Sequence, residues 1–453
     1  MQNNTKSALF RARLTVLLIS VAVILILSLA VCLIALGTRK TDSREEIAAK
    51  IETVGKSPWR SVADYIYRFG IRDFERAKLK TVERYYEQYY YTGSLPSSYA
   101  LAKETALFFL EHFYDELDLS DRASVTAALA NCYIAAVGDR YGFYRLPEEY
   151  AEYGEDMSGE RVGIGVEIQL DYKNNTILVT SVLGGSPAEA AGILEGDYIV
   201  GVGSVRIGDV GAAALADAIR GTEGTEVLIT VKRGDGEIAV SIVRRLFTER
   251  TVTLSLDAGK IAYIEIRRFK DNTDEQLAEA LEAARTGGAV GIIFDLRDNP
   301  GGYLDAVLNA VEMLVPSGVR LASYKYASGE EKVYTSKLSD RLDIPCVVLC
   351  NESTASAGEL FTAAVRDYAK MGLISAKTVG MTTYGKGVMQ STVTLGLGGA
   401  ALTLTVAYYN PPSDVNYEGV GITPDIEIEA KSEQLARAYT ELILLIANQG
   451  LQN

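Results

Sequence analysis

The fold class of this 453-residue chain is most clearly indicated by the segment Ile292-Ile293-Phe294-Asp295-Leu296-Arg297-Asp298-Asn299-Pro300-Gly301-Gly302. Its first half is mostly apolar, which is typical of a strand buried on both faces, and its second half is a turn rich in glycine and proline. Further strands are predicted at Ile261–Ile266 and Cys346–Cys350, and helices at 304–314 and 357–370. Strands that alternate with helices predict an α/β domain in which helices cover a sheet.

A second type of pattern lies upstream of this domain. Short β-rich runs separated by Gly and Asn turns predict strands at 162–170, 176–182, 198–202, 227–233 and 238–245. We therefore predict one small β-rich module. The expected organisation is a helical region with an acidic linker at 41–157, the β-rich module at 158–246, the α/β core at 250–430 and a C-terminal helix at 431–453.

The N-terminal segment is apolar. No charged residue lies between Leu14 and Leu36, a length that spans the roughly 30 Å of a bilayer core. Basic residues concentrated in 1–13 place that stub in the cytoplasm and the rest of the chain outside it. We expect a single-pass membrane protein with an extracytoplasmic ectodomain. A cleaved signal peptide is the alternative, but Gly37-Thr38-Arg39 is a poor cleavage site.

Composition excludes several classes of function. The net charge of -14 argues against a nucleic-acid partner, because phosphate binding needs clustered Lys and Arg. Four cysteines exclude a disulfide scaffold, and we expect neither a metal site nor a cofactor. His112 is the chain's single histidine, so a Ser-His-Asp enzyme would have to use it, yet it lies between aromatic residues in a predicted helix.

Ser356 lies where a buried strand ends and a helix begins, within 351–359. Free N–H groups at such a junction suit a nucleophile whose reaction develops an oxyanion, although serine is also an ordinary helix N-cap. Lys386 lies between two glycines in an apolar context and could serve as the base if burial keeps its amine neutral. The turn at Gly301-Gly302 could supply an oxyanion donor. Each signal alone also has a purely structural interpretation.

Three motifs in this order resemble the carboxyl-terminal processing (tail-specific) serine peptidases, which carry a PDZ domain. They are Asp-Leu-Arg-x-Asn-Pro-Gly-Gly at 295–302, Ser-x-Ala-Ser-Ala-x-Glu at 353–359 and Gly-Lys-Gly-x-x-Gln at 385–390. The segments 138–144, 163–166, 194–199 and 421–425 are similar to the same family. The resemblance implies a crotonase/ClpP-like α/β protease core with an inserted PDZ domain.

The resemblance also implies roles for individual residues. Ser356 would be the nucleophile, Lys386 the general base and Gln390 the residue that orients the lysine. The backbone N–H of Ala357 and that of Gly301 or Gly302 would form the oxyanion hole. Ser356 and Lys386 lie 30 positions apart, slightly more than is usual in the family.

The PDZ-like module would bind the free C-terminus of a substrate. An extended tail can add as a strand beside 162–170, with its carboxylate held by N–H groups around Gly163, Ile164 and Gly165. Leu215 and Ile219 would form the apolar wall that contacts the last side chain. One alternative is a glycine-containing strand start without this role, and another is a PDZ-like module that binds internal segments of a protein.

The expected function is a membrane-anchored serine endopeptidase that acts on protein C-terminal tails, and a homodimer through the terminal helices is compatible with the sequence. The alternative is an inert, membrane-tethered PDZ scaffold. A penicillin-binding type of acyl hydrolase is disfavoured, because that type needs Ser-x-x-Lys and the chain has none.

Overall fold

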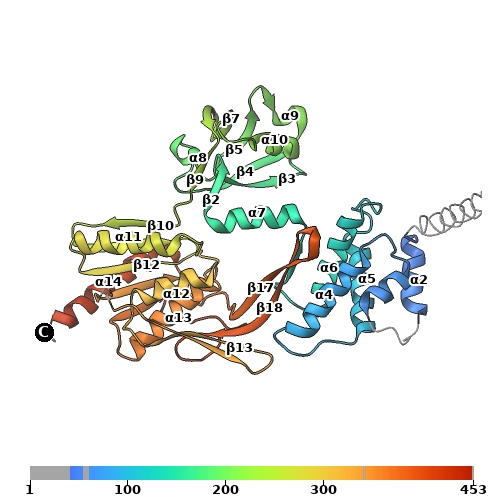
Figure 1. Cartoon of the computed structure of the whole chain (residues 1–453). Helices are drawn as coiled ribbons and strands as arrows, with labels where there is room; N and C mark the ends of the chain where they lie inside the picture. The colour runs from blue at the N-terminus through green and yellow to red at the C-terminus, as the bar shows by residue number, and fades with distance from the viewer. Residues whose placement is uncertain (1–40, 55–60, 340, 342, 451–453) are drawn as a thin grey trace, which may run out of the picture. The chain divides into compact units, whose positions relative to one another are not determined.

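A computed structural model describes residues 41–54, 61–339, 341 and 343–450 (Figure 1). The chain divides into two compact units. One combines the residues up to Leu146 with Thr392–Leu404, and the other combines Pro147–Ser391 with Thr405–Asn453. No helix within the described residues is long and apolar enough to cross a bilayer. The apolar segment predicted at 14–36 lies outside the described residues.

The first unit is helical, as the sequence predicts. Its elements are α2 (Arg44–Thr53), α3 (Val62–Phe69), α4 (Arg76–Tyr89), α5 (Ser98–His112), α6 (Arg122–Val137) and β1 (Phe143–Arg145), which pairs with residues 401–403 of β18. The buried Glu83 carboxylate of α4 accepts the first N–H groups of α3, from Val62 and Ala63. His112 ends α5 with an exposed side chain.

The β-rich module begins the second unit. It contains β2 (Glu160–Gly163), β3 (Val166–Asp171), β4 (Thr176–Val182), α8 (Pro187–Ala190), β5 (Tyr198–Val202), β6 (Val205–Arg206), α9 (Ile207–Val210), α10 (Ala212–Ile219), β7 (Glu226–Arg233), β8 (Gly236–Val243) and β9 (Arg245–Thr248). The main sheet has the order β3-β4-β5-β7-β8, so β3 is an edge strand. Its apolar core includes Ile177, Val179, Ile199 and Leu215.

The predicted strand 162–170 is in fact two strands. Residues up to Gly163 pair with β9, whereas residues from Val166 pair with β4. The break lies at Gly165, which has φ +81° and where a Cβ atom would lie 2.2 Å from Cβ of Ser186. Only glycine fits this conformation and this close approach, so the chain turns from one sheet to the other here.

The acidic stretch before the β-rich module was predicted to be a linker, but it forms helix α7 (Pro147–Ser158). Proline at the first helical position followed by Glu148 and Glu149 is favourable at a helix N-terminus, because proline loses no bond there and acids complement the helix dipole. The helix is anchored near its other end. Asp156 forms ion pairs with Arg161 and with the buried Lys270.

The α/β core contains one six-stranded sheet of order β10-β11-β12-β15-β16-β19. The strands are β10 (Val252–Leu256), β11 (Ile261–Ile266), β12 (Gly291–Asp295), β15 (Cys346–Cys350), β16 (Ala376–Gly380) and β19 (Ile426–Glu427). All neighbours are parallel except β10 and β11. The helices are α11 (Thr273–Thr286), α12 (Leu304–Glu312), α13 (Ala357–Lys370) and α14 (Lys431–Gly450).

Helices cover both faces of this sheet (Figure 1), which explains why its central strands β12 and β15 are buried at every position and mostly apolar. Successive side chains of a strand point to opposite faces. Ile293 of β12 accordingly packs with Ala438 and Leu442 of α14, whereas Phe294 packs edge-on against Phe361 of α13 with ring centroids 5.4 Å apart. Cys346 and Cys350 are buried thiols, as expected for core residues.

Further strands carry the lysine motif. β13 (Arg320–Tyr326) pairs with β14 (Glu331–Thr335) and with residues 407–410 of β18 (Ala400–Asn410), and β17 (Val388–Leu395) also pairs with β18. Lys386 lies two residues before β17, while Ser356 directly precedes α13. Both motifs therefore sit at element ends, where backbone groups remain available for other bonds.

Candidate active site

Ser356 occupies a strained turn between β15 and α13. Its φ and ψ are +53° and -117°, a region that residues with a side chain rarely adopt. Two bonds to the neighbouring turn hold the backbone there: Ala355 N–H donates to the Asn299 carbonyl at 2.8 Å, and Thr354 Oγ1 donates to the Leu296 carbonyl at 2.8 Å. Strain of this kind persists only where the surroundings enforce it, and it is concentrated at functional sites.

The glycine turn lies directly against this serine. Gly301 has φ +98°, and a Cβ atom there would lie 2.7 Å from Cβ of Ser356 and 2.8 Å from the nitrogen of Ala357. Gly302 is equally constrained, since its Cβ would lie 1.9 Å from the Phe269 carbonyl oxygen. Glycine at both positions lets the two backbones approach more closely than any other residue would allow.

Two backbone N–H groups at this contact have no hydrogen-bond partner among the described residues. The Gly301 N–H donates to Asn299 Oδ1 at 2.8 Å, so it is already used. In the part of the chain that the structure describes, the N–H groups of Gly302 and Ala357 donate to no protein atom. Ala357 is also the first residue of α13, where the helix dipole is positive. An anion beside Ser356 would therefore find two donors.

Glu359 joins the serine turn to the lysine loop. Its side chain is fully buried, and its Oε2 accepts from the backbone N–H groups of both Ser356 and Lys386, each at 2.8 Å. Its Oε1 accepts from Thr383 Oγ1 at 2.6 Å and from the Gly385 N–H at 2.7 Å. Burial raises the pKa of this carboxyl group, while the four donors act in the opposite direction. A single carboxylate oxygen of Glu359 thus holds the backbones of Ser356 and Lys386 next to each other.

The lysine loop is held from its other side as well. Tyr409 Oη donates to the Lys386 carbonyl at 2.9 Å, and the Gly387 N–H donates to Glu418 Oε2 at 2.7 Å. Asn416 Nδ2 donates to the Gly387 carbonyl at 2.8 Å. Lys386 itself is half-buried. Burial raises the pKa of the Tyr409 phenol, whereas hydrogen bonding with Tyr417 and with the Ser356 hydroxyl acts to lower it.

Gln390 lies on β17, four positions after Lys386. Its amide nitrogen donates to the Val388 carbonyl at 3.4 Å and to Thr405 Oγ1 at 3.3 Å. These bonds use only the nitrogen of the amide, and they fix the plane in which its oxygen lies. Ser353, the other serine of the motif, is exposed.

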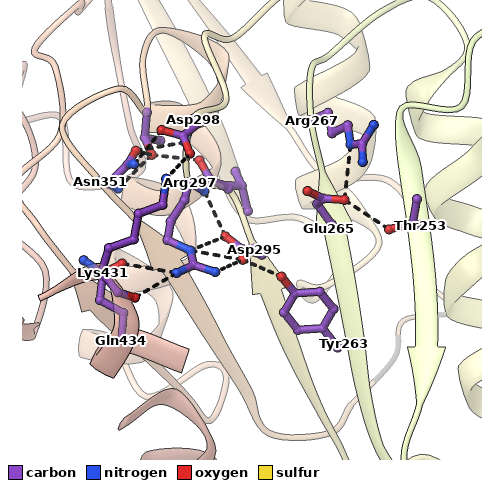
Figure 2. Close-up of polar contacts among 12 residues, drawn as sticks. Thr253, Tyr263, Glu265, Arg267, Asp295, Arg297, Asp298, Asn351, Lys431 and Gln434 are labelled. Carbon is purple, nitrogen blue, oxygen red and sulfur yellow. Dashed lines mark hydrogen bonds and ion pairs between the residues drawn. The ribbon is translucent and has the colours of Figure 1, made fainter. Parts of the chain in front are cut away.

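A charged network surrounds the residues that lead into the glycine turn (Figure 2). Asp295 at the end of β12 pairs with Arg297 and accepts from Tyr263 Oη at 2.6 Å. Asp298, which has φ +61°, exchanges hydrogen bonds with Asn351 of the serine loop, and Lys431 of α14 forms an ion pair with it at 2.8 Å. The Lys431 contact lowers the pKa of Asp298. The Asp-Leu-Arg-Asp sequence therefore shapes the turn and links it to α14.

The β-rich module has a groove of about 970 Å³ between edge strand β3 and helix α10. Gly163, Ile164, Gly165 and Ile219 all line it, as the sequence analysis expects of peptide-binding residues. Leu215 does not, because it is fully buried in the module's core. Residues 212, 215 and 219 share the helix face that packs into the core of the module. Ala213 and Ala216 line the groove at the position predicted for Leu215.

Comparison with known proteins identifies both domains. The model of peptidase family S41 matches residues 260–428, and a PDZ domain model matches residues 178–233. The "Probable CtpA-like serine protease" of Staphylococcus epidermidis (strain ATCC 12228 / FDA PCI 1200) is 30% identical over 367 residues, which is 81% of this chain and 68% of that protein. The chain belongs to peptidase family S41.

A second curated relative and a solved structure are also similar to this S41 chain. The protein of the same name from Staphylococcus aureus (strain COL) is 34% identical over 316 residues, 69% of this chain and 62% of that protein. This chain thus spans somewhat under two thirds of that relative's length. A crystal structure of a Bacteroides fragilis NCTC 9343 protein assigned to the S41 proteases covers 82% of this chain and 96% of that one, with a TM-score of 0.50 and 17% identity. At that identity the likeness shows the fold alone.

Sequence reasoning about this S41 chain missed the residues that bring the site together. Glu359 was part of the serine motif, but no role was inferred for it. A signal existed, since a glutamate three residues after a helix N-cap often bonds the cap's backbone. Tyr409, Asn416 and Glu418 carried no local signal, because they lie more than twenty residues from the lysine that they hold.

Proposed function

We propose that this chain is a serine endopeptidase that captures protein C-terminal tails in its PDZ groove and cleaves the substrate through Ser356 and Lys386. The observation that supports this best is the shared bond to Glu359 Oε2, which places the backbones of the two residues beside each other. An unreactive scaffold would not require a strained serine, two unused amides and a half-buried lysine in one place.

In the proposed mechanism, the neutral amine of Lys386 removes the proton of the Ser356 hydroxyl as the oxygen attacks the scissile carbonyl carbon. Negative charge develops on the carbonyl oxygen. The N–H groups of Ala357 and Gly302 are the natural donors to it, because the Gly301 N–H already donates to Asn299. Each such donor typically contributes about 3–4 kcal/mol of transition-state stabilisation.

Collapse of the intermediate releases the new amine, to which the Lys386 ammonium returns its proton. The acyl group stays on Ser356 until water, deprotonated by the same amine, attacks it. The Gln390 amide oxygen would accept from the lysine and keep it directed at the serine. This role agrees with the fixed amide plane, but it needs its own test. A Gln390→Glu variant should retain partial activity, whereas Gln390→Leu should lose most of it.

The dyad is tested by kinetics and labelling together. We expect Ser356→Ala and Lys386→Ala each to abolish cleavage of a fluorogenic peptide with an apolar tail, while Ser353→Ala remains active because Ser353 is exposed. A serine-reactive acylating probe should label the wild type at Ser356. If the wild type shows neither labelling nor turnover, the tethered scaffold is favoured. Turnover in the Ser356→Ala variant would instead indicate a different nucleophile.

We further propose that residues 14–36 anchor the enzyme in the membrane, with the catalytic domain outside the cytoplasm. Deleting this segment should release the protein from carbonate-washed membranes. Protease added outside intact spheroplasts should digest the anchored ectodomain. A homodimer through the terminal helices stays a prediction, for which the molar mass in detergent is the direct measurement.

A further inference from the structure

The groove of the PDZ domain offers an open strand edge to a peptide. β3 pairs with β4 on one side only, and its other side borders α10. In the described part of the chain, the N–H groups of Ile164 and Gly165, at the turn before β3, donate to no protein atom. An extended tail can pair with β3 and leave its carboxylate at these amides. This much belongs to the proposed function.

Helix α7 forms a further wall of this groove, although strand pairing with β3 does not require it. Glu149, Glu152, Tyr153 and Asp156 line the groove, and their spacing of i, i+3, i+4 and i+7 puts them on one helix face. A helix rises 1.5 Å per residue and a strand about 3.3 Å, so the 12 residues of α7 and the six of β3 extend over similar lengths of about 20 Å. The wall can therefore accompany several residues of a bound tail.

This wall is firmly placed. Asp156 is held by Arg161 and by the buried Lys270, which also forms an ion pair with Glu249 at 2.6 Å. In addition, the Asp271 N–H donates to the Met157 carbonyl. These bonds fix the end of α7 to the chain on both sides of the PDZ domain. The acidic face consequently has a defined position beside the groove.

The groove carries an excess of negative charge. Its acidic lining residues are Glu149, Glu152, Glu155, Asp156 and Asp217, and its basic ones are Arg161 and Arg220. Arg161 is paired with Asp156 and Arg220 with Asp217. Among the described residues, no ion pair neutralises Glu152 or Glu155, which are both exposed. A bound tail thus passes two uncompensated carboxylates.

We propose that this groove selects tails that combine an apolar last residue with lysine or arginine a few positions upstream. Ile219, Ala216 and Phe247 supply the apolar surface for the last side chain, while Glu152 and Glu155 attract the upstream cations. Tails with acidic residues at those positions are disfavoured by the same charges. This inference rests on the proposed function, because it concerns which tails the captured substrates carry.

Binding of labelled peptides tests the inference. The full chain with Ser356→Ala, solubilised in detergent, is titrated with peptides that share an apolar end and differ only in two upstream residues: Lys, Ser or Glu. We expect the Lys peptide to bind about tenfold more tightly than the Ser peptide at low salt, or about threefold for each charge pair. High salt should remove the difference.

A matched pair of variants locates the effect. Glu152→Gln with Glu155→Gln should abolish the preference for Lys, whereas Glu148→Gln with Glu160→Gln removes two exposed acids that do not line the groove and should preserve it. Equal binding of the Lys and Ser peptides, or an equal loss in both double variants, overturns the inference while tail capture stands. If no peptide binds, tail capture itself fails and the inference with it.

Discussion

Replacing Glu359 with glutamine changes one atom of a buried side chain and tests whether this carboxylate assembles the active site. Each of its two oxygens accepts two hydrogen bonds, so a side-chain amide can satisfy only one of the two pairs. If the NH₂ group takes the place of Oε1, the Thr383 hydroxyl can rotate and accept from it, but the Gly385 N–H cannot. The alternative orientation would leave the N–H groups of both Ser356 and Lys386 without an acceptor.

At least one buried N–H therefore loses its acceptor, which costs about 1–3 kcal/mol of folding free energy. We expect the melting temperature to fall by several degrees, since about 1 kcal/mol shifts it by roughly 2–4 °C in a domain of this size. Activity should fall further. Displacing a reacting group by about 1 Å can cost 100-fold in rate, so we expect kcat to drop about that much with little change in KM.

The assay is steady-state cleavage of a tailed fluorogenic peptide, combined with thermal unfolding followed by circular dichroism. Glu352→Gln is the matched control, because Glu352 is an exposed glutamate in the same loop and should behave like the wild type. A Glu359→Gln enzyme with wild-type kcat and melting temperature would refute the assembling role. A loss of stability with unchanged kcat would confine Glu359 to folding.

Three other predictions follow from the same structure. Gly301→Ala should abolish cleavage, because its Cβ would lie 2.7 Å from Cβ of Ser356. Gly329→Ala, whose Cβ would meet nothing within 4 Å, controls for the strain of a positive φ, and equal activity of both variants would contradict the steric argument. Cleavage should decline as the pH falls, because a lysine base must be neutral, and a flat kcat/KM down to about pH 5 would argue against Lys386 as the base. Burial raises the pKa of Glu83 to about 7. Its contribution to stability is therefore complete below about pH 4.5 and is lost as the pH rises through 7, by up to about 3 kcal/mol. Between these pH values the free energy of unfolding, measured with a chemical denaturant, should fall more steeply in the wild type than in Glu83→Gln, and identical pH profiles would exclude the effect.

How far the sequence predicts this structure depends on the range of the contacts involved. Helix α13 begins and ends where the pattern places it, and the turn at 298–302 was recognised, because both depend on local signals. The break at Gly165 was missed, since it arises from contact with Ser186, a residue distant in sequence. Leu215 was assigned to the groove for a related reason: an apolar helix face points either to a core or to a ligand, and periodicity does not distinguish the two.

The acidic stretch that became α7 shows a different limit. Its glutamates were interpreted as a solvated connection, although Pro147 followed by two glutamates is a helix start. What holds this helix in place is Lys270, more than one hundred residues further along the chain. The same holds for Glu359 and Lys386, whose partnership requires the strands between them to be folded. Sequence motifs therefore indicate candidate functional residues, whereas contacts between residues distant in sequence become known only from the folded structure.

The network behind the glycine turn links catalysis to the order of synthesis. Arg297 and Asp298, next to the predicted oxyanion donors, complete their contacts with Lys431 and Gln434. Lys431 and Gln434 are synthesised after both Ser356 and Lys386. A nascent chain can therefore expose both reactive side chains while the turn beside them still lacks its outer support. In the proposed peptidase, the turn beside the nucleophile therefore gains this outer support only once α14 has docked.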